Sequence, residues 1–144
     1  MKKNTYWKQV KQNAVALISL IIAVSSLSYS TWRNEKTEDN RNQRYASFEI
    51  LLKLNELQQV VFHHFYDKDI QNKGNIRTGW TYVLTISDLS KLLNKSIQNS
   101  SNNLTDVWAS QWQDLTDSQA SVDAVLAAID AVRSDSLNRL KSLE

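Results

Sequence analysis

The chain begins with one long apolar stretch, which is followed by a series of amphipathic segments. No charged residue occurs between Gln12 and Trp32, and the 19 residues Ala14–Trp32 would form about 28 Å of helix, close to the roughly 30 Å hydrocarbon core of a bilayer. Aromatic residues whose rings favour the headgroup layer lie at both ends of this stretch, namely Tyr6, Trp7, Tyr29 and Trp32. The pattern predicts a transmembrane anchor.

A cleaved secretory signal is the alternative interpretation of this stretch. The apolar core Ala14–Leu27 fits the length of a signal core, and small residues around Ser25 and Ser28 would suit cleavage. The aromatic residues beyond it favour an anchor that is retained. Four lysines precede the stretch with no acidic residue among them (Lys2, Lys3, Lys8, Lys11). Four basic residues, mixed with acidic ones, also follow the stretch (Arg33, Lys36, Arg41, Arg44), so the rule that basic flanks stay in the cytoplasm gives a near tie. The N-terminal amine, the tighter lysine cluster and the short head favour the N-terminus inside and the remainder outside.

The remainder of the chain has the spacing of amphipathic helices. Residues 33–44 are polar on every side and predict a stalk or a solvated extension of the membrane helix. From Tyr45 onward apolar residues recur at helical spacing, at Phe48, Leu51, Leu52, Leu54, Leu57, Val61 and Phe65. Residues 80–86 alternate like a strand, but a helical stripe also runs through Tyr82, Ile86, Leu89 and Leu93. A helix is favoured because no partner strand occurs elsewhere.

Two further helices are expected after a polar segment. Residues 96–103 (SIQNSSNN) predict a loop, and a helix follows from Leu104 to Leu115. Thr116 to Gln119 has the form of a capping box that would open the last helix, whose apolar face runs from Val122 to Leu143. The fold class predicted is therefore all-α, with an N-terminal transmembrane helix and a small antiparallel bundle. The expected divisions are a cytoplasmic head (1–13), an anchor (14–32), a stalk (33–44) and an extracytoplasmic bundle (45–144).

Composition narrows the range of functions. The chain has no Cys, no Pro and only two Gly, which favours helices and excludes a disulfide framework. After the apolar stretch there are 13 basic and 15 acidic residues, so that part carries a formal charge of −2. It shows no basic patch of the kind that binds nucleic acid, and no nucleic-acid partner is expected.

Few residues are candidates for chemistry. His63 and Asp67 lie one helical turn apart, with Glu56 two turns before His63, and together they offer the minimum of ligands for a divalent metal. A solvated His–Asp pair is the favoured interpretation, so no metal, cofactor or catalytic residue is expected. His64 should face the apolar side. No nucleophile–base, phosphate-loop or metalloprotease motif is present, and an enzyme is not expected.

The segment Gly74–Trp80 (GNIRTGW) holds both glycines, a lone Arg77 and Trp80. A planar cation next to flexible backbone could grip a carboxylate or phosphate, whereas the simpler interpretation is a turn anchored by Trp80. His63, Asp67, Arg77 and Trp80 are thus the candidate contacts for a ligand or partner. Trp108 and Trp112 share the apolar side of their helix and are expected in the core rather than around a ligand.

Small residues share one face of the predicted anchor, namely Ala16, Ser19, Ala23, Ser26 and Ser30. Small side chains allow two helices to approach in lipid, so this face predicts a homodimer through the transmembrane helix. Serines tolerated near the headgroups would give the same pattern.

Three segments, SYSTWRNEKTEDNR, FEILLKLNELQQVVFHHFYDKD and GNIRTGW, resemble a group of small bacterial single-pass membrane proteins with no known activity. The resemblance covers about the first 95 residues and implies a bacterial inner-membrane anchor with a periplasmic helical domain. We therefore expect a membrane-anchored interaction module that docks a periplasmic or membrane protein. The alternative is a ligand-sensing helical domain that acts through a partner.

Overall fold

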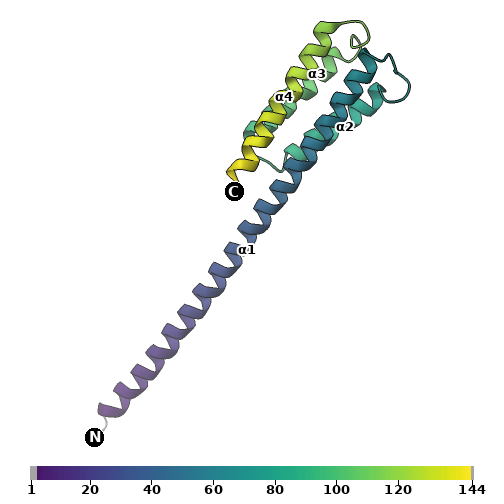
Figure 1. Ribbon diagram of the computed structural model, residues 1–144. Helices are drawn as coiled ribbons and strands as arrows, with labels where there is room; N and C mark the ends of the chain where they lie inside the picture. The colour runs from purple at the N-terminus through teal and green to yellow at the C-terminus, as the bar shows by residue number, and fades with distance from the viewer. Residues whose placement is uncertain (1–2, 144) are drawn as a thin grey trace. The chain divides into compact units, whose positions relative to one another are not determined.

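The computed structural model describes residues 3–143 and, within that range, contains four helices and no strand. The helices are α1 (Lys3–Phe65), α2 (Ile76–Ser90), α3 (Lys95–Gln111) and α4 (Gln119–Ser142) (Figure 1). The predicted all-helical class is confirmed, and residues 80–86 are helical. The chain divides into two units, residues 1–40 and 41–144, which are described separately below.

The first unit is the N-terminal part of α1. Residues 13–39 are exposed along their whole length, including all five small residues of the predicted packing face. Trp32, at the end of the apolar stretch, lies 6.1 Å from the Tyr29 ring and 5.4 Å from the Lys36 amine. This part of α1 is long and apolar enough to span a membrane, although a signal sequence or a soluble helix can have the same length and composition.

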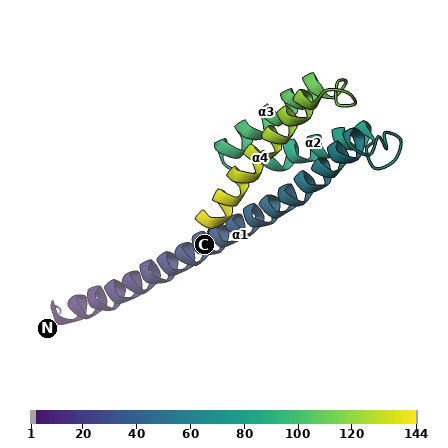
Figure 2. The same ribbon diagram turned by 45° about the horizontal axis from the view of Figure 1, so that its top comes forward.

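The second unit has a hydrophobic core to which all four helices contribute. Helix α3 packs against both α2 and α4, and Figures 1 and 2 show α3 alongside α4. The largest fully buried side chains are Trp108, Ile50, Leu54, Leu57, Ile86, Ile97, Leu104, Leu115 and Ile129. Two side-chain hydrogen bonds join α4 to α1. The Arg133 guanidinium donates to Gln58 Oε1 at 2.7 Å, and Arg139 Nε donates to Gln43 Oε1 at 2.9 Å.

The buried face of α1 differs from the predicted one. Leu54, Leu57 and Val61 are buried as expected, but Phe48 and Leu52 are 57% and 56% exposed. Their places in the core are taken by Ala46 and Ile50, which are almost fully buried. The apolar residues of this segment therefore cover two faces of the helix, and spacing alone did not show which face the other helices bury.

The predicted loop over residues 96–103 is wrong, because α3 already begins at Lys95. Asn94 caps the helix by accepting a hydrogen bond from the Ile97 N–H at 3.3 Å. Ile97, Ser101, Leu104 and Trp108 then form one buried face at spacings of three and four residues. The Ser and Asn residues between them lie mostly on the outer side, so packing of one face overrides their low helix propensity.

The predicted capping box at Thr116 is also displaced. The N-cap of α4 is Ser118, whose hydroxyl accepts from the Ser121 N–H at 3.2 Å. Thr116 lies before the helix, and its hydroxyl is bonded to His64 instead. A side-chain partner far along the chain thus replaced the local partner that the sequence suggested.

Gly79 allows α2 to approach α3 closely. A Cβ atom at this position would lie 2.4 Å from Cζ2 and 2.5 Å from Cη2 of Trp108, well inside carbon–carbon contact. Trp108 is fully buried and its ring meets Trp80 edge to face, with centroids 6.4 Å apart. The glycine is therefore explained by space for the indole, and its φ is not in the left-handed region.

Candidate functional site

The connection between α1 and α2 folds back on the end of α1. Lys68 turns the chain with a left-handed φ of 54°, and the Gly74 N–H donates to the Asp69 carbonyl at 2.9 Å. A Cβ on Gly74 would lie 2.5 Å from the backbone nitrogen of His64, so only glycine fits here. Close backbone contact therefore holds the connection against the end of α1. Residues of this connection line two surface hollows, which are described below.

The Asp69 carboxylate organises the middle of this connection. It accepts from the Asn72 side-chain amide at 3.0 Å and from the Asn72 and Lys73 N–H groups at 3.3 Å each. Desolvation is the largest single influence on the pKa of Asp69 and raises it, but the hydrogen bonds from Asn72 and Lys73 together outweigh it and lower the pKa below the ordinary 3.8. The ionised carboxylate is therefore the form that holds the turn.

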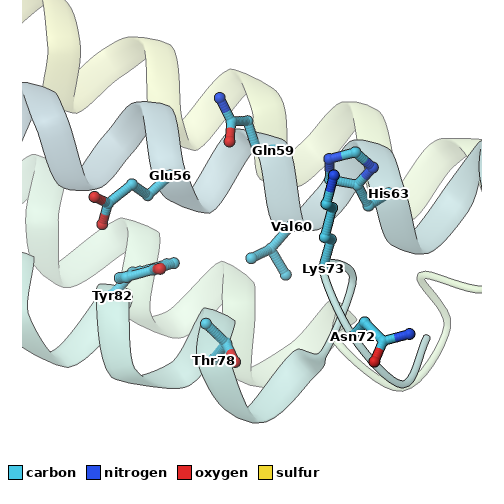
Figure 3. A pocket seen from close by; sticks show the side chains of 8 residues that line it. All are labelled: Glu56, Gln59, Val60, His63, Asn72, Lys73, Thr78 and Tyr82. Atoms are coloured by element: carbon cyan, nitrogen blue, oxygen red, sulfur yellow. The ribbon is translucent and has the colours of Figure 1, made fainter. Parts of the chain in front are cut away.

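The first hollow lies between α1, α2 and this connection, and Figure 3 shows the side chains around it. It has a volume of about 290 Å³ and is lined by Glu56, Gln59, Val60, His63, Asn72, Lys73, Thr78 and Tyr82. Both charge signs are present, and Glu56 is already engaged, since its carboxylate lies 2.8 Å from the Lys53 amine. Hydrogen bonding to Glu56 raises the pKa of Lys53. The hollow is thus a largely self-compensated polar surface.

The predicted His63–Asp67 pair is present, with Nδ1 of His63 2.5 Å from Oδ2 of Asp67. Asp67 is exposed, and Glu56 is turned to Lys53 rather than to this pair. Among the residues that the structure describes, no group of three His, Asp or Glu side chains is arranged to hold a metal ion.

The second hollow contains the other two predicted residues, Arg77 and Trp80. Its volume is about 500 Å³, and its lining is His64, Ile70, Asn75, Ile76, Arg77, Trp80, Trp112 and Thr116. The four predicted contacts are therefore not brought together: His63 lines one hollow, while Arg77 and Trp80 line the other. We refer to the second one as the Arg77 cavity.

His64 joins three segments at the wall of the Arg77 cavity. Its ring is 3% exposed, with Nδ1 2.7 Å from the Gly74 carbonyl oxygen and Nε2 2.9 Å from the Thr116 hydroxyl. A carbonyl only accepts, so Nδ1 carries a proton, and in the neutral ring Nε2 accepts from Thr116. The prediction that His64 faces the apolar side is confirmed, and its role as a tie was missed.

Trp112 and Thr116 are the cavity residues that sequence reasoning overlooked. Trp108 is in the core as predicted, whereas Trp112 is only partly buried and reaches the cavity from the end of α3. Nothing local marks these residues, because they meet Arg77 only through the packing of α3 on α2.

Comparison of the chain with protein-family models, with curated proteins and with solved structures finds no match. The resemblance drawn from the sequence stays a prediction.

Proposed function

We propose that this protein is a membrane-anchored, extracytoplasmic interaction module without catalytic activity, which docks an α-helical segment of a periplasmic or membrane protein. One observation carries the proposal. An apolar stripe on α1 and the residue after it, here called the α1 stripe, is exposed, and its members are Tyr45, Phe48, Leu52, Phe62 and Tyr66.

The α1 stripe has the spacing of a helix-docking seam. Its residues follow one another at intervals of three and four, and Asn55 and Gln59 occupy the two intervening positions. The core of the second unit takes a different face of α1, through residues such as Ile50 and Leu57. Soluble domains seldom leave several large apolar side chains uncovered along one face, and the three–four repeat, interrupted here by Asn55 and Gln59, matches the knobs of a second helix.

The charged side chains beside the α1 stripe are compensated within this chain. Glu49 and Glu56 lie next to the stripe, and both carboxylates are near the Lys53 amine, at 3.9 Å and 2.8 Å. The stripe therefore favours a partner helix for its apolar seam rather than for a particular charge.

The proposed location is the bacterial inner membrane, with a single span, a cytoplasmic N-terminus and a periplasmic second unit. The uncharged stretch, its aromatic ends and the lysines before it support this topology. Within the second unit, the proposed arrangement is an antiparallel bundle, supported by the short connections at residues 91–94 and 112–118. Alkaline phosphatase fused after Glu144 should be active, and an inactive fusion would reverse the orientation.

Photo-crosslinking in intact membranes tests the docking proposal. A photoreactive residue at position 48 of the full-length chain should give one dominant heterologous product. Leu52→Asp should remove that product, because it puts a charge into the α1 stripe one turn away. Leu84→Asp is the matched control, since Leu84 on α2 is 53% exposed against 56% for Leu52. No product, equal loss with both variants, or a product of two copies of this chain would contradict the proposal.

A further inference from the structure

The Arg77 cavity is unlike the first hollow in its chemistry. Apolar and aromatic side chains make up half of its lining, through Ile70, Ile76, Trp80 and Trp112. Its volume of about 500 Å³ lies within the range of small-molecule sites, which are typically apolar with a few polar groups that fix orientation.

Charge in the cavity has one sign. Arg77 is the only charged residue in its lining, and no acidic residue lines it. Within the described residues, the Arg77 guanidinium makes no hydrogen bond or ion pair, although its backbone N–H is bound by the Asn75 side chain at 2.9 Å. The guanidinium is a planar donor that matches a carboxylate in two parallel hydrogen bonds.

The other polar groups of the cavity serve its structure. His64 and Thr116 bond to each other, and His64 also holds the Gly74 carbonyl, so their hydrogen-bonding protons are engaged. The Asn75 side chain also lines the cavity, but it accepts from the Arg77 backbone N–H and donates to the Gln71 carbonyl at 3.4 Å. This leaves Arg77 as the group able to pair with a negative charge. The His64 ring also joins the end of α1, the α1–α2 connection and the α3–α4 connection into one wall. The cavity is therefore formed before a ligand enters.

We propose that the Arg77 cavity binds a small monocarboxylate with an aromatic or branched aliphatic body. The carboxylate pairs with the Arg77 guanidinium, and the body lies against Trp80, Trp112 and the two isoleucines. An inorganic anion would leave this apolar wall unfilled, and a neutral apolar molecule would leave Arg77 unpaired. This ligand site is independent of the α1 stripe and of any partner docked there.

The test uses the full-length protein in nanodiscs and four probes: phenylacetate, 4-methylpentanoate, phenylacetamide and acetate. The readout is the indole N–H resonances of the tryptophans. Both larger carboxylates should shift Trp80 and Trp112 saturably and leave Trp32 unchanged. Phenylacetamide should bind at least about tenfold more weakly, as expected for loss of a charge-assisted pair, and acetate should cause no saturable shift.

Three variants complete the test. Arg77→Gln should weaken phenylacetate binding about tenfold or more and make the acid and the amide nearly equal. Ile70→Trp should block the cavity, because Ile70 is a partly exposed lining residue that can take a larger side chain. Lys91→Gln, an exposed cation after α2 that does not line the cavity, is the control and should change nothing. No saturable shift with either larger carboxylate, or unchanged affinity in Arg77→Gln, would overturn the proposal.

Discussion

Substitution of Gly79 tests the packing of α2 on α3 most directly. The added methyl of Gly79→Ala would start 2.4 Å from Trp108 Cζ2, more than 1 Å inside ordinary carbon contact. Trp108 is fully buried and lies against Trp80, so its ring has little room to withdraw. Overpacking of this kind costs about 1–3 kcal/mol. Alanine gains about 0.8–1 kcal/mol over glycine in a helix. The overlap is severe, so we expect a net loss of about 1–2 kcal/mol.

A double-mutant cycle separates the collision from other effects. Trp108→Phe removes the ring atoms that the new methyl would meet, and by itself it leaves a cavity. In that background Gly79→Ala should become neutral or stabilising, so the coupling between the two changes should be about 2 kcal/mol. Urea unfolding of the full-length protein in mild detergent, followed by circular dichroism at 222 nm, measures all four stabilities. If Gly79→Ala had the same effect in both backgrounds, the steric explanation would be refuted.

Three further outcomes are expected. Ser136→Ala should raise stability by about 1 kcal/mol, because the Ser136 hydroxyl is buried with no hydrogen-bond partner among the described residues; exposed Ser134→Ala is the control in the same urea titration, and an equal effect of both would contradict the reasoning. The lowered pKa of Asp69 means that its stabilisation of the α1–α2 connection is complete above 3.8 and is lost as the pH falls through the folded-state pKa. Hydrogen exchange of the Asn72 and Lys73 N–H groups should speed up over that range relative to other loop amides, and Asp69→Asn should abolish the pH dependence. If the small face of the anchor is a dimer interface, Ser19→Ile and Ala23→Ile should weaken self-association of residues 12–32 in a membrane dimerisation assay, whereas Leu20→Ile should not.

The helical class followed from residues whose pattern is local. Leu54, Leu57 and Val61 repeat at helical spacing, and the absence of a second strand decided the assignment of residues 80–86. The face of α1 could not be decided in the same way. Phe48 and Leu52 are as apolar as Ile50, and only the position of the other helices determines which of them is buried.

In the candidate site, too, contacts between residues close in sequence were predictable and contacts between residues far apart in sequence were not. The pairing of His63 with Asp67 needs only one helical turn, and it was predictable. The surroundings of Arg77 depend on Thr116 and Trp112, which are more than 30 residues away along the chain. Helical spacing relates only residues a few positions apart in the chain. The sequence therefore indicated Arg77 and Trp80 as candidates without showing which residues surround them. For the same reason, Thr116 was assigned to a helix cap when its hydroxyl serves His64.

The contacts between α4 and the start of the second unit have a consequence for chain order. Arg139 bonds to Gln43, and the Arg44 guanidinium donates to the Leu143 carbonyl, so residues distant in sequence meet at one end of the unit. A short linker could therefore join residue 143 to residue 41, and new termini could be opened in the exposed turn at residues 91–92. The helices of such a circular permutant would follow one another in a different order while every packed neighbour stayed the same. The fold of this unit is thus determined by which helix faces pack together. The order in which the helices occur along the chain can change without altering that packing.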